Sequence, residues 1–301
     1  MNTSNNGDRN GLGISLRILS GLLMGGMFVS VKAVSEDVPL GEIVFFRSFF
    51  ALIPLIIFLW IRNEFPHGMA TKRPLDHFLR ASFGALALFG SFAAVARLHL
   101  AEAILIAQLS PILMAVAAVF ILSERMTLWR IAGLVLGFAG VVVLVWPDLQ
   151  GGIDNSRLTG YLIGFAAAVL SALALIMVRS LNRTESPGAI AIYFVLASIA
   201  GALFTLPWGW ILPSGNTLLL LIASGLFGGF GHIAMTMAFR YTEASRLAPY
   251  EYIALLWPLL ADLFIFKLPL STSFLLATPL VLAGAAVAAL EGRNQADGKS
   301  R

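Results

Sequence analysis

Apolar residues run through this chain in long stretches that are separated by short polar links. A stretch of about 17–25 apolar residues can cross the hydrocarbon core of a bilayer as an α-helix, whereas half-buried strands alternate apolar and polar positions. The pattern predicts ten transmembrane helices. Their expected ranges are 16–34, 41–61, 75–96, 101–122, 127–146, 159–178, 188–208, 217–238, 245–266 and 272–290.

Composition supports an all-α integral membrane protein. The chain has 301 residues, of which 58% are hydrophobic and only 12% are charged. A soluble protein of this length does not need so many apolar residues to form its core. The net charge of +4 does not indicate nucleic acid, because no basic cluster exceeds two adjacent residues, as at Lys72-Arg73. The expected partners are the lipid bilayer and a small-molecule substrate, and the sequence leaves a homodimer open.

The distribution of Lys and Arg predicts the orientation of the chain. With the N-terminus in the cytoplasm, all but five of the 20 Lys and Arg residues fall on cytoplasmic segments. The five on the outer side are Lys32, Arg47, Arg97, Arg157 and Lys267. Because cytoplasmic loops carry the excess of positive charge, both termini should be cytoplasmic. We expect a multi-pass protein of the bacterial inner membrane.

An internal repeat divides the predicted helices into two groups of five. Residues 81–103 align without gaps on residues 222–244, which places Gly84 on Gly225 and Glu102 on Glu243. Five crossings start the second copy on the opposite face, so the expected domains are two inverted repeats, 12–148 and 157–292, with short polar tails 1–11 and 293–301. Inverted repeats are typical of secondary transporters, which bind substrate near the membrane midplane and expose it alternately to either side.

Three segments carry a family resemblance that covers nearly the whole chain. They are PLGEIVFFRSFFA in the second helix, the Ser110-Pro111 to Glu124 pattern in the first half, and SRLAPYEYIALLWPLLADLFIF in the second half. Together they resemble the EamA-type branch of the drug/metabolite transporter superfamily. The second half departs from the pattern, because Tyr252 stands where Pro111 would and no glutamate matches Glu124.

The resemblance implies a secondary transporter of small metabolites that works without a cofactor. The LAPYEY segment and the overall length are similar to the bacterial riboflavin transporters, so riboflavin uptake is the leading expectation. The alternative is an exporter of amino acids or related metabolites. A multi-span membrane enzyme is less favoured, because the sequence lacks an H-E-x-x-H helix and its four histidines are scattered, which also argues against a metal site.

Two carboxylates interrupt the predicted helix 245–266. Charged residues within membrane helices are expensive and usually functional, which makes Glu251 a candidate for substrate binding. Asp262 shares its helix face but lies near the outer interface, where it could pair with Lys267 or be hydrated. Pro258 in this helix and Pro111 in helix 101–122 each remove a backbone hydrogen bond, and we expect broken helices at these positions.

Further candidates come from the other helices. Arg47 aligns with Val195 in the repeat, so its charge is not required by the architecture; it could anchor an anionic or carbonyl group, reach the interface, or pair with Glu42. His232 aligns with Ser91 and could act as a ligand, a proton relay or a hydrogen bond between helices. Glu102 is expected to cap the fourth helix. Three aromatic candidates could stack on a flat ring system, and they are Phe46, Tyr252 and Trp257.

Overall fold

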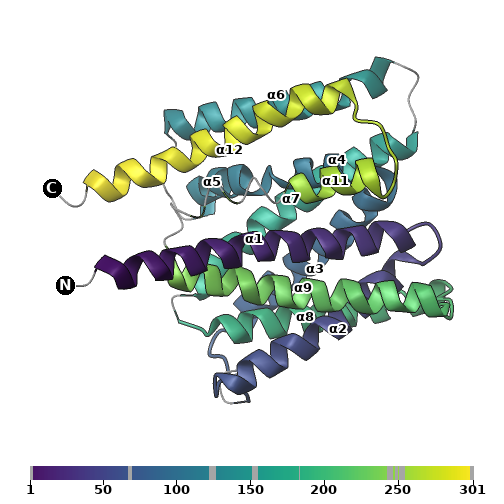
Figure 1. The fold of residues 1–301 in the computed structure, drawn as a ribbon, viewed down its shortest axis with the longest axis horizontal. Helices are drawn as coiled ribbons and strands as arrows, with labels where there is room; N and C mark the ends of the chain where they lie inside the picture. Colours follow the sequence, from purple (N-terminus) through teal and green to yellow (C-terminus); the bar gives the residue numbers. More distant parts are fainter. Residues whose placement is uncertain are drawn as a thin grey trace.

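The computed structural model describes residues 3–66, 70–121, 127–150, 155–182, 184–242, 247, 250 and 255–298. Every regular element within these ranges is a helix (Figure 1). The helices lie roughly alongside one another as a bundle, and α1 begins at the same end of the bundle at which α12 finishes. The expectation of an all-helical membrane protein is therefore met in its architecture.

The first part of the chain forms six helices. They are α1 Thr3–Val34, α2 Leu40–Ile61, α3 Pro74–Arg97, α4 Leu100–Ala107, α5 Ser110–Ile121 and α6 Leu128–Gln150. The second part contains α7 Asn155–Leu181, α8 Pro187–Leu203, the 3-10 turn η2 Leu206–Trp208, α9 Gly215–Tyr241, α11 Leu256–Phe264 and α12 Thr272–Gly298.

Length and hydropathy make this a multi-pass membrane protein. Within the described residues, seven helical segments are long and apolar enough to span a bilayer, and α4 with α5 counts as one of them, Leu100–Ile121. Two further apolar helices are shorter, α8 and residues Thr272–Val287 of α12. The long apolar runs of the sequence therefore become membrane-spanning helices for the physical reason expected.

Two predicted helices differ from the observed ones. The range 101–122 is divided at Gln108 and Leu109, two residues before Pro111. The range 188–208 is too long, because α8 ends at Leu203 and the chain turns through η2 to Gly209, whose φ of 84° lies in the left-handed region that glycine tolerates. The segment 245–266 lies largely outside the described residues, and its described helix is α11.

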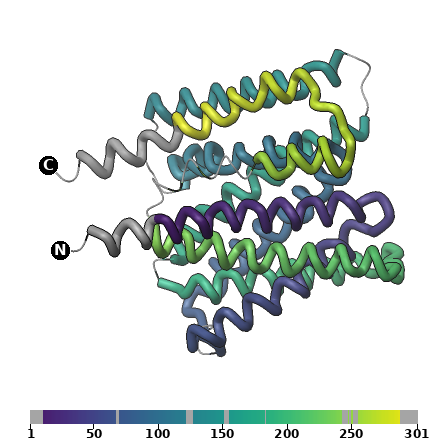
Figure 2. Tube along the Cα trace, viewed as in Figure 1, coloured from purple at the N-terminus to yellow at the C-terminus, as the bar shows by residue number. Residues whose placement is uncertain are grey.

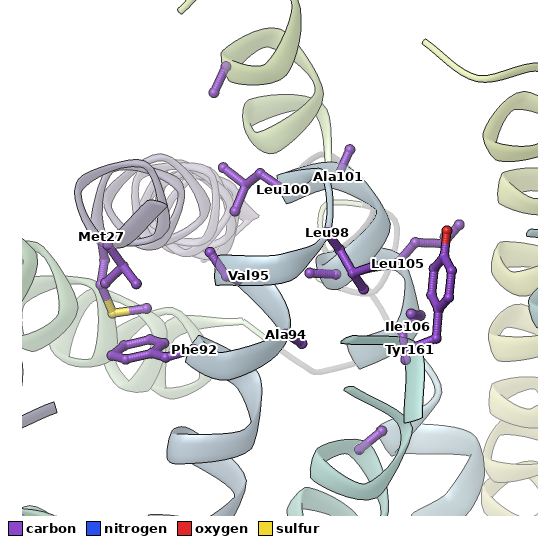
Figure 3. Packing of buried hydrophobic residues seen from close by; sticks show 14 of the residues in the cluster. Met27, Phe92, Ala94, Val95, Leu98, Leu100, Ala101, Leu105, Ile106 and Tyr161 are labelled. Atoms are coloured by element: carbon purple, nitrogen blue, oxygen red, sulfur yellow. The ribbon is translucent and has the colours of Figure 1, made fainter. Parts of the chain in front are cut away.

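The helices pack in pairs that are distant in the sequence. α1 lies along α9, α3 lies along α7, and α6 lies along α12 (Figure 2). α2 packs against both α8 and α9. A cluster of buried hydrophobic residues surrounds the corner between α3 and α4, where Phe92, Leu98, Leu105 and Ile106 are at most 1% exposed (Figure 3). This corner therefore holds together helices from both parts of the chain.

Glycine determines how closely α6 and α12 approach. A methyl group on Gly284 of α12 would lie 2.7 Å from the backbone oxygen of Gly133 and 2.7 Å from the backbone nitrogen of Gly137, both in α6. A methyl group on Gly140 would lie 2.6 Å from a side-chain carbon of Val281. Small residues allow membrane helices to bring their backbones together, where van der Waals contact is the main attraction.

We predict that Gly284→Ala destabilises the protein by about 1–3 kcal/mol, because the added methyl group overpacks a backbone contact. Gly215→Ala is the matched control, since a methyl group there meets nothing within 4 Å. Thermal unfolding of the two purified variants in detergent measures the difference. Equal melting temperatures for both variants would show that the close approach of α6 and α12 does not limit stability.

Candidate functional site

Arg47 places a charge in the interior of the bundle. It lies about two turns into α2 and is only 2% exposed. Its Nε donates to the sulfur of Met27 in α1 at 3.5 Å, and its Nη2 lies 3.3 Å from Nε2 of His232 in α9. Its Nη1 is buried and has no hydrogen-bond partner. A buried donor without a partner costs free energy, so a hydrogen-bond acceptor that binds next to Nη1 would be stabilised.

His232 lies next to Arg47, so the structure brings together two of the candidates chosen from the sequence. Because a guanidinium can only donate hydrogen bonds, Nε2 of His232 must be the acceptor in this contact. His232 is exposed and so is Thr236, one turn further along α9, whose hydroxyl donates to the His232 carbonyl at 2.9 Å. The buried charge of Arg47 therefore borders an accessible face of α9.

Gly228 makes room for the guanidinium. A methyl group at this position of α9 would lie 3.2 Å from Nε of Arg47 and 2.9 Å from the sulfur of Met27. The backbone of α9 can approach α2 closely only because Gly228 lacks a side chain. The sequence suggested helix packing for the glycines of α9; the structure adds that one of them shapes the surroundings of Arg47.

Arg80 was missed as a candidate from the sequence, where it counted only toward the positive charge of the cytoplasmic side. It lies on α3 with its guanidinium carbon 4.5 Å from the ring centroid of Phe194 in α8. Its Nε and Nη1 are buried without hydrogen-bond partners. The signal in the sequence was an arginine about two turns inside a membrane helix.

Glu42, the alternative partner for Arg47, is engaged elsewhere. Glu42 lies in the first turn of α2, and its Oε2 accepts a hydrogen bond from the backbone nitrogen of Ile211 at 3.1 Å. The residue is 1% exposed. The prediction that Arg47 could pair with Glu42 is therefore wrong, and so is the alternative that its side chain reaches the interface.

The aromatic candidates pack against different partners. Phe46 stacks on Phe50 of its own helix, with ring centroids 6.1 Å apart and planes inclined by 11°. Trp257 packs against α1, where a methyl group on Gly25 would lie 2.7 Å from its Cβ, and its indole nitrogen is buried without a partner. Two other candidates, Glu251 and Tyr252, lie outside the described residues.

The prolines mark helix ends. Pro111 is the second residue of α5, and the carbonyl of Ala107, which Pro111 cannot satisfy, accepts the hydroxyl of Ser110 at 2.8 Å. Pro258 is the third residue of α11, a helix that begins at Leu256. The first turn of a helix tolerates proline because its N–H groups have no partner within the helix.

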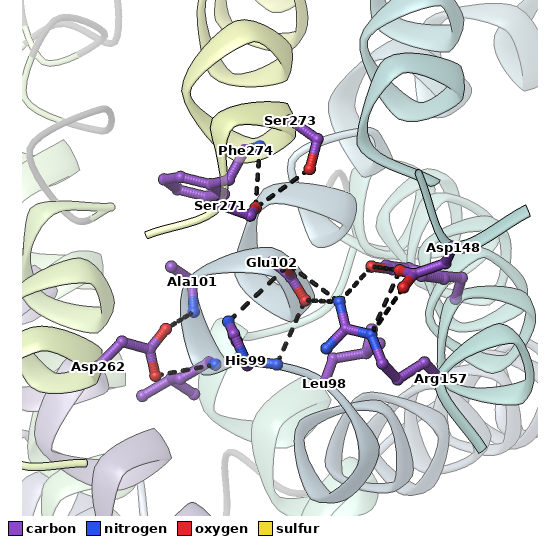
Figure 4. A network of polar contacts seen from close by, with 12 residues as sticks. Leu98, His99, Ala101, Glu102, Asp148, Arg157, Asp262, Ser271, Ser273 and Phe274 are labelled. Atoms are coloured by element: carbon purple, nitrogen blue, oxygen red, sulfur yellow. Dashed lines mark hydrogen bonds and ion pairs between the residues drawn. The ribbon is translucent and has the colours of Figure 1, made fainter. Parts of the chain in front are cut away.

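Asp262 joins α11 to the beginning of α4 (Figure 4). Its two carboxylate oxygens accept hydrogen bonds from the backbone nitrogens of Leu100 at 3.1 Å and Ala101 at 2.7 Å, and the residue is 2% exposed. A carboxylate at this position satisfies free N–H groups and faces the positive end of the helix dipole. The expected pairing with Lys267 or hydration is therefore wrong.

Glu102 belongs to a second group of charges at the same end of the bundle. Its Oε2 accepts the backbone N–H of His99 at 3.4 Å, so it caps α4 as expected, and it also pairs with Arg157 of α7 at 3.0 Å. Arg157 in turn contacts Asp148 of α6 at 3.2 Å and the hydroxyl of Tyr161 at 2.7 Å. These residues tie α4, α6 and α7 together.

Lys32 completes this end of the bundle from α1. Its ammonium donates to the carbonyl oxygens of Val95 and Leu98, each at 2.9 Å, at the end of α3. A cation at a helix C-terminus is favourable because the free carbonyls carry partial negative charge. The corner between α3 and α4 is therefore held by a cation from α1 on one side and a carboxylate from α11 on the other.

A cavity of about 400 Å³ opens near this end, between α1, α2, α3 and the start of α7. Its lining includes Pro39, Ile43, Phe92, Arg97 and Ser156. Ile43 lies one helical turn from Arg47 along α2.

The comparisons with known proteins identify the family. The model of the EamA-like transporter family matches residues 11–146 and again residues 158–290. The chain belongs to the EamA-like transporter family. The family resemblance carried by the sequence motifs is thereby confirmed, and the protein is a membrane transporter of this family.

Named relatives include transporters of two kinds. An S-adenosylmethionine uptake transporter of Rickettsia prowazekii is 32% identical over 75% of this chain and 74% of its own. A pseudopaline exporter of Pseudomonas aeruginosa is 30% identical over 81% of this chain and 84% of its own. A crystal structure that shares 22% identity matches 94% of this chain and 98% of its own with a TM-score of 0.66, which shows the same fold.

We predict that Arg157→Gln destabilises the protein by about 1–3 kcal/mol, because the buried carboxylate of Glu102 loses its ionic partner. The exposed pair of Arg62 and Glu64 offers a matched control, and Arg62→Gln should cost at most about 1 kcal/mol. Thermal unfolding in detergent compares the two. If Arg62→Gln were as damaging as Arg157→Gln, the network around Glu102 would have no special part in stability.

Proposed function

We propose that this EamA-family protein is a secondary transporter that moves a small metabolite across the bacterial inner membrane by alternating access, with Arg47 and His232 in its substrate site. The observation that carries the proposal is the buried guanidinium of Arg47, whose Nη1 has no partner while Nη2 lies 3.3 Å from His232. Intramembrane charges of this kind mark substrate or ion pathways in transporters.

In the proposed architecture, ten helices form two inverted repeats, 12–148 and 157–292. The seven long spans, the two shorter apolar helices and the nine-residue α11 support this number. The family model matches once within each proposed repeat. The packing supports the same relation, because exchanging the two repeats converts the pair of α1 and α9 into the pair of α7 and α3.

The outer side is proposed to be the end at which α4 meets α11. These two helices belong to different repeats, and the carboxylate of Asp262 connects them through two backbone hydrogen bonds. Rocking of one repeat against the other must separate this contact when the outer side opens. Both termini then lie in the cytoplasm, as the distribution of Lys and Arg predicts.

The relatives bear on the substrate. Their printed names concern S-adenosylmethionine and pseudopaline, and the relatives described above include no protein named for riboflavin. We therefore place amino-acid-derived metabolites ahead of riboflavin, which rests on the LAPYEY segment alone. Because one relative is named for uptake and another for export, the assay must follow both directions.

We predict that cells producing the protein will accumulate or expel a labelled compound from a panel of S-adenosylmethionine, amino acids and riboflavin, and that Arg47→Ala lowers this transport by at least about tenfold. Loss of a charge-assisted hydrogen bond of about 1.5–3 kcal/mol predicts that magnitude. Arg62→Ala, on the exposed end of the same helix, is the control at matched membrane levels. Unchanged transport by Arg47→Ala would remove this residue from the substrate site.

We further predict that Asp262→Asn opens the outer end more often, because an amide has one acceptor oxygen where the carboxylate has two. The chain has no cysteine, so Ala101→Cys, at a position that is 2% exposed, provides a single reporter. Labelling by a membrane-impermeant maleimide from outside should become several times faster in the Asp262→Asn background.

Asp76→Asn is the control for this experiment, because Asp76 pairs with Arg73 at the opposite end of α3. Equal labelling rates in the two backgrounds would show that Asp262 does not hold the outer end closed.

A further inference from the structure

Two arginines in the interior carry unsatisfied hydrogen-bond donors. The buried nitrogens without a partner are Nη1 of Arg47 and both Nε and Nη1 of Arg80. These side chains come from α2 and α3, and Nη2 of Arg47 lies 3.3 Å from Nε2 of His232 in α9. A guanidinium cannot satisfy another guanidinium, because neither accepts a hydrogen bond, so these donors need acceptors of another kind.

Three described carboxylates on the side of the bundle where α3 begins have other partners. Asp76 pairs with Arg73 at 2.7 Å, and Glu64 pairs with Arg62 at 2.7 Å. Glu185 lies 3.5 Å from His77, whose ring also packs on Tyr193. Across the described part of the chain, the charges of Arg47 and Arg80 thus have no carboxylate within ion-pair distance.

Architecture does not require these two charges. The ungapped repeat alignment extends to place Arg80 on Leu221, which is fully buried, and Arg47 aligns with Val195, which is 5% exposed. The second repeat packs the same helices with apolar residues. Within the described residues, a buried guanidinium such as that of Arg47, without a carboxylate beside it, costs more than it contributes to folding unless an anion joins it, so the presence of these arginines in one repeat alone points to a ligand.

We propose that Arg47, Arg80 and His232 form an anion site that binds a carboxylate of the transported metabolite. The inference rests on the proposed transport function and narrows its substrate class to carboxylate-bearing compounds. A carboxylate accepts charge-assisted hydrogen bonds from guanidinium groups, and the aromatic ring of Phe194, 4.5 Å from the guanidinium carbon of Arg80, keeps that guanidinium in place. A neutral flat molecule would leave both charges uncompensated.

Binding of simple anions to the purified protein in detergent tests the site without knowledge of the natural substrate. The probes are potassium succinate, potassium acetate, potassium phosphate and potassium chloride at equal ionic strength, and the readout is the melting temperature. A ligand that binds only the folded state raises this temperature. We expect the two carboxylates to raise it more than chloride or phosphate, and Arg47→Gln and Arg80→Gln to lose that difference while Arg62→Gln keeps it.

Three results would overturn the inference. Carboxylates could act no more strongly than chloride, phosphate could exceed both carboxylates, or all variants could respond equally, which would indicate binding elsewhere on the protein. None of these results depends on transport, so uptake or export in cells separately decides the proposed function. If Arg80→Gln failed to fold, Arg80→Lys would take its place, because it keeps the charge and should retain part of the carboxylate effect.

Discussion

Groups that can form hydrogen bonds must find partners inside a membrane bundle, and this constraint explains most of the polar side chains seen here. The corner between α3 and α4 exposes carbonyl groups at one helix end and N–H groups at the next. Lys32 satisfies the carbonyls at 2.9 Å, and Asp262 satisfies the N–H groups at 2.7 and 3.1 Å. Arg47 and Arg80 are among the exceptions, and they are assigned to substrate because they are charged donors without a carboxylate beside them in the described part of the chain.

In the proposed architecture, the two repeats share a framework of helices but differ in their buried charges. Glycines let the backbones approach in the pair of α6 and α12 and around Gly228 of α9. The charges differ, because Arg47 and Arg80 stand where the second repeat has Val195 and Leu221. A symmetric framework permits the two halves to exchange arrangements, while an asymmetric site binds one ligand in one orientation.

Much of the fold followed from the sequence, because a helix that crosses a bilayer needs a long apolar run. The long helices begin and end within a few residues of those runs, apart from the extension of α1 and α12 into polar sequence. The break expected at Pro111 is seen at Gln108 and Leu109, since proline marks a helix end without fixing on which residue the preceding helix stops.

Side-chain partners were harder to predict than helices. Arg47 and His232 were chosen separately, and nothing in the sequence showed that they lie 3.3 Å apart. Asp262 looked like an interfacial carboxylate because its partners are backbone groups 161 and 162 residues away. Arg80 looked like a cytoplasmic charge because counting Lys and Arg does not distinguish a side chain in a loop from one inside a helix.

The measurement that tests the account most directly is the electrostatic potential next to Arg47. Thr236→Cys places a thiol on the exposed face of α9 one turn from His232, in a chain without other cysteines, and Asn216→Cys at the exposed start of α9 is the reference. At each position, the reaction rate of the anionic sulfonatoethyl methanethiosulfonate is divided by that of the cationic trimethylammonioethyl reagent. We predict that this ratio is higher at position 236 than at position 216. An unreactive thiol at 236, or equal preference at both positions, would contradict a water-accessible, positively charged substrate site.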